Sequence, residues 1–267
     1  MNSADLFNLK GRVAMVTGAG QGVGRGIALA LAGSGAGGVV VNDFYADRAE
    51  AVAEEIRALG VRAMPMVGDV GDLEQVRAGV AAATAELGTI SILVNNAGNG
   101  GPDGFPREMP LFWETDPAEW SRFFHVNTFG VMNCSHAVLP AMVEQRYGRI
   151  LTIVSDAGRT IEGRQAAYAA AKAAAAGLMR GIAADTARFG ITANSIAISS
   201  MRPPMNPEQL EAYLASDRYK AQMTHYTIRR TGLPEDIAGT ALLLCSDASS
   251  WTTGQVYPVD GGYSSAL

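Results

Sequence analysis

Residues Thr17-Gly-Ala-Gly-Gln-Gly-Val-Gly24 form a glycine-rich turn that directly follows the apolar run 13–16 and opens a helical pattern. Such a turn needs glycine because a side chain would block the tight change of direction and keep the backbone away from a diphosphate at the helix N-terminus. Taken alone, the stretch is equally consistent with a purely structural turn. Its position between a strand and a helix indicates a dinucleotide-binding turn.

The same alternation of strand and helix continues along the whole chain. Short β-branched runs without strict polar alternation predict buried strands, and the longer stretches between them predict helices. Repeated βα units imply a parallel sheet with helices on both faces. No Ser/Gly/Pro-rich linker divides residues 1–267, so we predict a single α/β domain of three layers with a doubly wound, Rossmann-type sheet. The expected strands are 13–16, 38–41, 90–94, 149–154 and 191–198, and the expected helices are 22–34, 46–59, 73–87, 117–145 and 165–189.

Asp43 closes the second predicted strand, nineteen residues beyond Gly24. An acidic side chain at this position accepts hydrogen bonds from the adenosine ribose hydroxyls of a dinucleotide. The 2′-phosphate of NADP would meet the carboxylate as a like charge, at a cost of about 4 kcal/mol for two unit charges about 4 Å apart at an effective dielectric of about 20. The sequence therefore favours NAD, unless Arg25 or Arg48 neutralises the repulsion. The alternative interpretation is a solvated aspartate at a strand end.

Two segments interrupt the alternation, 99–119 and 199–231. Both follow predicted strands, and ligands in open α/β sheets bind beyond the carboxyl ends of the strands. We expect them to form the walls of a substrate site, with 199–231 as a lid; the alternative is that both are surface loops without contact to a ligand. The apolar wall residues would be Phe105, Met109, Leu111, Phe112 and Trp113 on one side and Met201, Met205, Tyr213 and Met223 on the other.

Tyr168 and Lys172 lie four residues apart on a predicted helix and therefore on the same face. A neighbouring lysine charge favours the phenolate over the phenol, whose ordinary pKa is about 10, so the pair can carry a proton. This spacing also occurs by chance on helix surfaces. Here, however, Ser155 ends a predicted strand thirteen residues upstream of Tyr168, and Asn127 lies in the preceding predicted helix.

These motifs together resemble those of the classical short-chain dehydrogenase/reductase family, and the resemblance covers essentially the whole chain. Asn127, Ser155, Tyr168 and Lys172 match the catalytic tetrad of the family in order and spacing. The other matching stretches are Thr17 to Gly24, Asp69-Val70, Asn95-Asn-Ala-Gly98, Gly232-Leu-Pro-Glu-Asp-Ile-Ala238 and Gly254-Gln-Val-Tyr-Pro-Val-Asp-Gly-Gly262.

The resemblance implies a role for each matching residue. Tyr168 would exchange a proton with the substrate oxygen, and Lys172 would hold the nicotinamide ribose and lower the tyrosine pKa. Ser155 would hydrogen-bond the substrate oxygen, while Asn127 would anchor a water that relays protons from Lys172. The implied subunit contact, through the helix 165–189 and the one before it, would give a homodimer or homotetramer. The implied cofactor-binding residues are Gly18, Gln21, Gly22, Val23, Gly24, Asp43, Asp69, Val70, Asn96, Tyr168 and Lys172.

Two positions depart from, or add to, the pattern of the family. Ile198-Ser199 replaces the usual Pro-Gly after the sixth strand of the family, and a serine must strain to copy a turn that glycine permits. This puts the contacts to the nicotinamide carboxamide in doubt. Asp156 directly follows the catalytic serine, where it either touches the substrate or is solvated; we expect it to be solvated.

Composition excludes several classes of function. The net charge is −5 and no basic cluster exceeds Arg229-Arg230, so we expect no nucleic-acid partner. Cys134 and Cys245 form neither a disulfide framework nor a thiolate metal motif, which favours a cytoplasmic protein. The first ten residues contain Asp5 and no long apolar stretch, and no apolar run is long enough to span a membrane. The three histidines lack ligand spacing, so we expect no metal: His125, His136 and His225.

The leading hypothesis is an NAD-dependent oxidoreductase that interconverts a secondary alcohol and a ketone on a medium-sized, largely apolar substrate. One alternative is a 3-hydroxyacyl-thioester dehydrogenase or 3-oxoacyl reductase, for which a basic patch formed by Arg159, Arg164 or Arg202 would be diagnostic. A second alternative, motivated by the altered turn at Ile198-Ser199, is a catalytically silent nucleotide-binding sensor.

Overall fold

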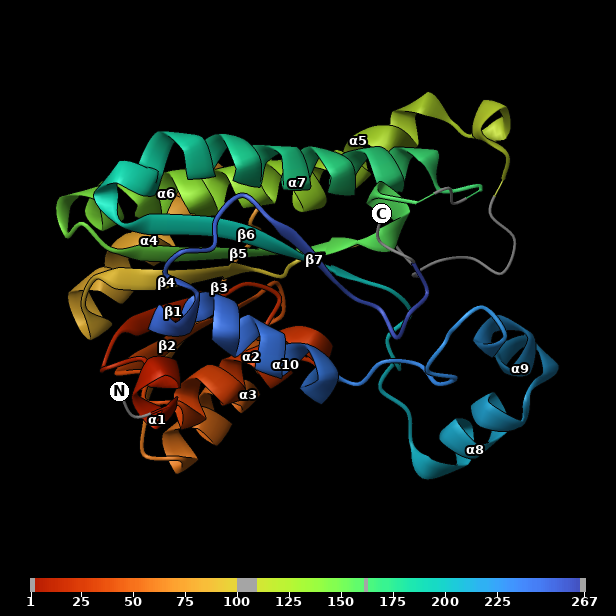
Figure 1. The fold of residues 1–267 in the computed structure, drawn as a ribbon, viewed down its shortest axis with the longest axis horizontal. Coiled ribbons are helices and arrows are strands. Elements are labelled where there is room, and N and C mark those ends of the chain that lie inside the picture. Colours follow the sequence, from red (N-terminus) through yellow and green to blue (C-terminus); the bar gives the residue numbers. More distant parts are fainter. Residues whose placement is uncertain (1–2, 100–109, 161–162, 265–267) are drawn as a thin grey trace.

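The computed structural model describes residues 3–99, 110–160 and 163–264. They form one sheet of seven parallel strands in the order β3-β2-β1-β4-β5-β6-β7 (Figure 1). This confirms the single, doubly wound α/β domain expected from the sequence. The strands are β1 Val13–Val16, β2 Gly38–Asp43, β3 Arg62–Val67, β4 Ile90–Asn95, β5 Gly148–Ser155, β6 Ile191–Ile198 and β7 Val256–Val259.

Helices cover both faces of the sheet. One face packs against α2, α3 and α10, and the other against α4, α6 and α7 (Figure 1). The four strands β1, β2, β4 and β5 are buried on both faces, which explains their apolar sequences without polar alternation. The helices are α1 Ser3–Phe7, α2 Gly22–Gly33, α3 Ala46–Ala58, α4 Leu73–Leu87, α5 Trp120–Phe124, α6 Val131–Glu144, α7 Ala166–Thr186, α8 Pro207–Ala215, α9 Asp217–Met223 and α10 Pro234–Cys245.

The predicted helix 117–145 is not one regular helix. A 3₁₀ turn, Pro117–Glu119, leads into α5, and a π-helical segment, His125–Gly130, separates α5 from α6. A π segment inserts an extra residue into the helical turn and is frequent at functional sites. Asn127 lies in this segment, so the irregularity sets the direction of its side chain.

The segment 199–231 leaves the sheet and returns to it. Met201 forms a parallel β-bridge with Gly232, so the two ends of the excursion lie side by side. Between them, α8 and α9 stand away from the layers beyond the carboxyl edge of the sheet (Figure 1). No helix among the described residues is long and apolar enough to cross a membrane.

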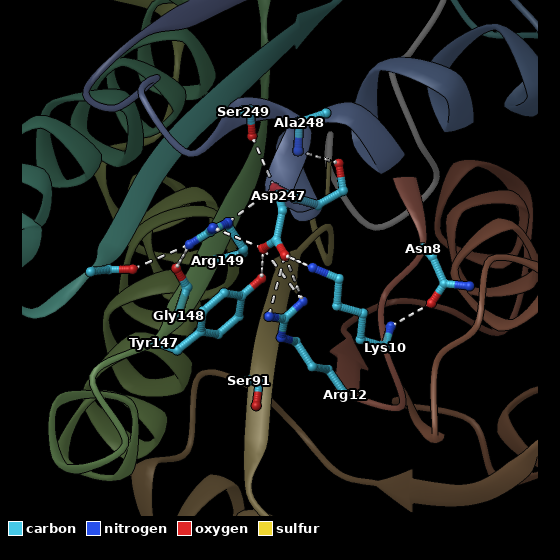
Figure 2. Close-up of polar contacts among 12 residues, drawn as sticks. Asn8, Lys10, Arg12, Ser91, Tyr147, Gly148, Arg149, Asp247, Ala248 and Ser249 are labelled. Carbon is cyan, nitrogen blue, oxygen red and sulfur yellow. Dashed lines mark hydrogen bonds and ion pairs between the residues drawn. The ribbon is translucent and has the colours of Figure 1, made fainter. Parts of the chain in front are cut away.

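Asp247 receives contacts from three cationic side chains at the edge of the sheet where the strands begin (Figure 2). Its carboxylate lies 2.7 Å from Lys10 Nζ, 3.4 Å from Arg12 and 3.3 Å from Arg149. Tyr147 donates a further hydrogen bond of 3.0 Å, and both guanidinium groups lie over its ring. Burial raises the pKa of Asp247, but these hydrogen bonds and charges outweigh burial and lower it overall. The cluster joins the N-terminal segment, β5 and the end of α10.

Replacement of Asp247 by asparagine should lower the free energy of unfolding at pH 7 by about 2 kcal/mol, because Arg149 is buried and would lose its counter-charge. Since the folded-state pKa is lowered, the stabilisation is present above the unfolded-state pKa of about 3.9 and is lost as pH falls through the folded value. Urea unfolding at pH 7 and pH 3 measures both effects. Glu50→Gln, which breaks the exposed pair with Arg57, is the control and should change little; an equal loss in both variants would contradict the prediction.

Candidate active site

A cavity of about 630 Å³ opens at the carboxyl edge of the sheet, where the strand order reverses between β1 and β4. Such reversal points are where open α/β sheets bind ligands. The predicted cofactor residues Gly18, Gln21, Gly22, Val23, Asp43, Asp69, Val70 and Asn96 all line this cavity.

The glycine-rich turn has the shape that a diphosphate requires. Gly22 begins α2 with a φ of +56°, and an added Cβ there would meet only open space, so the helix N-terminus is bare on the cavity side. Gly24 is buried, and an added Cβ would lie 2.3 Å from the Gly18 carbonyl oxygen. The turn therefore combines an accessible helix N-terminus with a close packing that only glycine allows, which fits a dinucleotide.

Asp43 is buried at the end of β2 and holds the turn in place. Its carboxylate accepts hydrogen bonds from the backbone N–H of Gly20 at 2.9 Å and of Tyr45 at 3.0 Å. Arg25 is paired with Glu55, whereas Arg48 lines the cavity and lies 4.3 Å from the centre of the Tyr45 ring. The solvated interpretation of Asp43 is therefore wrong, and Arg48 is a cation that lines the cavity beside it.

Asp69 connects the far end of the cavity to the π-helical segment. One carboxylate oxygen accepts the Gly71 N–H at 2.8 Å, and the other lies 2.9 Å from His125 Nε2. The ring of His125 covers Gly71, where an added Cβ would come within 2.2 Å. His125 was not expected at the site, because its role depends on a contact across 56 residues of sequence.

Tyr168 and Ser155 meet beyond the end of β5. Their hydroxyls are hydrogen-bonded, and the ring of Tyr168 contacts that of Phe123 edge-on. Burial raises the pKa of Tyr168, and the Ser155 hydrogen bond opposes this rise only in part. The expected lowering of this pKa is therefore wrong for the structure described, in which burial dominates.

Lys172 lies one helical turn after Tyr168 and is buried. Its Nζ donates a 3.0 Å hydrogen bond to the carbonyl of Ile153, inside β5. Burial lowers the pKa of Lys172 to about 8, because the charged ammonium loses its hydration. The lysine can therefore change its charge near neutral pH.

Asn127 approaches Lys172 across Gly98. A Cβ on Gly98 would lie 2.8 Å from Asn127 Oδ1 and 3.0 Å from Lys172 Nζ, so the absence of a side chain brings both groups to one point. The amide nitrogen of Asn127 donates to the carbonyls of Phe123 and Asn99, which leaves its oxygen directed toward Gly98. The four tetrad residues thus lie in two pairs: Ser155 is hydrogen-bonded to Tyr168, and Asn127 and Lys172 both approach Gly98.

The turn after β6 is not strained. Ser199 is not among the described residues with a positive φ, so the expected strain of a serine in place of glycine is wrong. Instead its hydroxyl lies 2.5 Å from the hydroxyl of Tyr226, which also accepts the Ser200 N–H at 3.2 Å. A buried tyrosine from the segment 199–231 therefore supports this turn through hydrogen bonds.

Asp156 is not solvated, as its exposed fraction is only 2%. It begins the 3₁₀ turn Asp156–Gly158, and Ser155 caps this turn by accepting the Ala157 N–H at 3.2 Å. A buried carboxyl therefore lies directly beside Ser155. Its burial could not be predicted from the local sequence, because Ser264, which also contacts it, lies 108 residues further along the chain.

The expected substrate walls are described only in part. Phe105 and Met109 lie outside the described residues. Of the remaining wall residues, Trp113 is 78% exposed, whereas Met223 is buried and Met201 packs against the core. Residues missed from the sequence also line the dinucleotide cavity: Phe44 and Tyr45 directly after Asp43, and Arg122 on α5. The position of Phe44 and Tyr45 after a strand end was a usable signal for them.

Comparisons with known proteins agree with this geometry. Residues 18–264 match the family model described as enoyl-(acyl carrier protein) reductase. The 7α-hydroxysteroid dehydrogenase of Escherichia coli K12 is 38% identical over 262 residues, which are 98% of each chain.

Two solved structures are similar over nearly all of the chain. One is 7α-hydroxysteroid dehydrogenase complexed with NADH and 7-oxo glycochenodeoxycholic acid, with a TM-score of 0.86, 37% identity and 98% of each chain covered. The other is a gluconate 5-dehydrogenase of Burkholderia cenocepacia in complex with NADP and tartrate, with a TM-score of 0.87, 34% identity and 100% of each chain covered. The fold, the tetrad order and these matches show that the chain is an oxidoreductase of the classical short-chain dehydrogenase/reductase family.

Proposed function

We propose that this protein is an NAD-dependent oxidoreductase that interconverts a secondary alcohol and a ketone on a medium-sized, largely apolar substrate. The observation that carries the proposal is the hydrogen-bonded pair Ser155 and Tyr168, which lies beyond the strand ends with buried Lys172 one helical turn away. The neighbouring cavity fits a dinucleotide. A bound nicotinamide would supply the hydride chemistry.

The side chains of the tetrad divide the remaining work. Tyr168 exchanges a proton with the substrate oxygen, and the Ser155 hydroxyl fixes that oxygen by a hydrogen bond. Lys172 holds the cofactor ribose and, with a pKa of about 8, passes on the proton. Asn127 directs its side-chain oxygen toward the same point as Lys172 Nζ, so a water at Asn127 would continue the proton path to solvent.

The substrate class rests on the apolar residues beyond the strand ends and on the hydroxysteroid relative. The alternative, a 3-oxoacyl or 3-hydroxyacyl thioester substrate, is suggested by the matching family model. A thioester substrate would need a basic patch, and one of the three arginines expected to form it, Arg159, is instead paired with Asp156 at 3.3 Å. The alternative of a catalytically silent nucleotide-binding sensor was based on a strained turn at Ser199, and this turn is not strained.

We also propose that the protein is cytoplasmic and forms a homodimer or homotetramer. Both cysteines are buried as free thiols, which suits a reducing compartment. Phe129 and Met132, on the helical segment before α7, are 52% and 44% exposed. A second subunit packed there would cover them.

Turnover of secondary alcohols tests the proposed function. With NAD, hydroxysteroids should be oxidised faster than the polar sugar acid gluconate or a 3-hydroxyacyl thioester, and Tyr168→Phe should lower kcat by about 10³-fold because it removes the proton carrier. NADH absorbance measures the rates, and NADH binding to the variant should stay largely intact. Near-normal rates in this variant, or binding of NAD without turnover of any alcohol, would refute the proposal.

Replacement of Asp43 by asparagine should raise the ratio of NADP to NAD activity by at least about tenfold, because it removes the charge that repels a 2′-phosphate. The ratio of kcat/KM values for the two cofactors gives the result. Asp47→Asn, an exposed position in the first turn of α3, is the control and should leave the ratio unchanged. A preference for NADP in the unmodified protein would contradict the assignment.

Replacement of Gly24 by alanine should weaken NADH binding by about tenfold or more, because the new Cβ would displace the Gly18 carbonyl and with it the diphosphate turn. Calorimetric titration with NADH measures this affinity. Gly33→Ala is the matched control on the same helix: nothing lies within 4 Å of its Cβ, so binding should not change. Equal affinities in the two variants would exclude this role for Gly24.

A further inference from the structure

The environment of the Asp156 side chain offers few hydrogen-bond donors to an ionised carboxylate. The side chain is almost fully buried, and its Oδ2 has no hydrogen-bond donor among the described residues. Its Oδ1 has two long contacts, 3.3 Å from Arg159 and 3.4 Å from the Ser264 hydroxyl. An ionised carboxylate accepts several hydrogen bonds, and a buried oxygen without a donor is costly.

Asp260 faces Asp156 across the end of β6. The register pairs Ser155 with Ile198 and Ile198 with Val259, so Asp156 and Asp260 are each the first residue beyond the same sheet edge, two strands apart. The hydroxyl of Ser264 lies 2.6 Å from Asp260 and 3.4 Å from Asp156, which shows that the two carboxyl groups converge on one point.

The hydrogen bonds distinguish the two acids. Asp260 accepts three short bonds, from the N–H groups of Gly262 at 2.8 Å and Ser264 at 2.9 Å and from the Ser264 hydroxyl. These donors satisfy an ionised carboxylate, whereas Asp156 has no comparable set. A proton on Asp156 Oδ2 would supply the missing hydrogen bond, with Asp260 as its acceptor.

We propose that Asp156 is a positioning residue that takes up a proton at mildly acidic pH and then donates to Asp260, and that this shared proton ties the C-terminal segment 260–264 to the turn that carries Ser155. The inference rests on the proposed dehydrogenase activity, in which Ser155 fixes the substrate oxygen. The pair thereby couples the position of the serine to the path of the chain after β7.

The surroundings determine how the pair responds to pH. Burial and the Asp260 charge raise the pKa of Asp156 to about 6, while Arg159 opposes the rise. On the side of α7, Gly158 packs against the backbone of Lys172 and Ala173. In the same part of that helix, the Tyr168 hydroxyl is hydrogen-bonded to Ser155 and Lys172 Nζ donates to the Ile153 carbonyl. Because the folded-state pKa is raised, the stabilisation is complete below the unfolded value of about 3.9 and is lost as pH rises through about 6.

Infrared spectroscopy tests the shared proton without any substrate. The difference between the unmodified protein and Asp156→Asn should contain the band of a protonated carboxylic acid at pH 5, replaced by a carboxylate band at pH 7.5. A carboxylate band at both pH values would overturn the proposal.

Hydrogen–deuterium exchange tests the tie to the C-terminal segment. After correction for intrinsic rates, amides of 260–264 in the unmodified protein should lose up to about tenfold in protection between pH 5 and pH 7, because a group one unit above its pKa is about nine-tenths ionised. Asp156→Asn carries a permanent donor and should lose none. Asp217→Asn, at an exposed position on α9, should follow the unmodified protein. Identical pH profiles for Asp156→Asn and the unmodified protein would refute the tie, and pH-independent protection in the unmodified protein would do so even if the variant did not fold.

Rates of ketone reduction distinguish a role of Asp156 in positioning Ser155 from a role in packing alone. At pH 5, where Asp156 carries the proton, Asp156→Ala should lower kcat for the ketone by about tenfold or more with little change in KM for NADH, and Asp156→Asn should recover most of it. Equal losses in the two variants would contradict the role of the hydrogen bond. If no ketone is reduced by the unmodified protein, the proposed function fails, whereas the infrared and exchange results still decide whether the proton is shared.

Discussion

The hydroxyl of Thr17 joins the two halves of the fold at the point where the strand order reverses. It is buried and accepts the backbone N–H groups of Asn96 and Ala97, each at 3.0 Å. The side chain of Asn96 returns two hydrogen bonds to the carbonyls of Thr17 and Gly18, at 2.9 and 3.0 Å. The glycine-rich turn after β1 is thereby held against the end of β4.

This contact also explains why the tetrad lies next to the cavity. Gly98 follows Asn96 by two residues, and it is the point at which Asn127 and Lys172 converge. A shift of the chain after β4 would therefore move the glycine-rich turn and the meeting point of Asn127 and Lys172 together. The amide of Asn96 is occupied by the loop carbonyls, so its part in cofactor binding, predicted from the sequence, would be to shape the cavity wall.

The regular interior of the fold was predictable from the sequence, and its edges were not. The central strands are buried and largely apolar, and the bounds of β1 and β6 at 13–16 and 191–198 agree with the prediction. The edge strands β3 and β7 contain Pro65 and Pro258, which are tolerated at a sheet edge but obscure the strand pattern. The tetrad was recognisable because its spacing is local to a few elements, whereas the burial of Asp156 depends on Asp260 and Ser264, about a hundred residues later.

The contacts around Asp247 also limit the order in which the protein can fold during synthesis. Lys10 and Asp247 are 237 residues apart in sequence, and α10 packs against α2, where a Cβ on Gly26 would come within 2.7 Å of Pro234. A nascent chain therefore exposes one apolar side of α2 until α10 has left the ribosome. Contacts of such long sequence separation form slowly. The early βα units must accordingly wait, incompletely covered, until α10 has been synthesised.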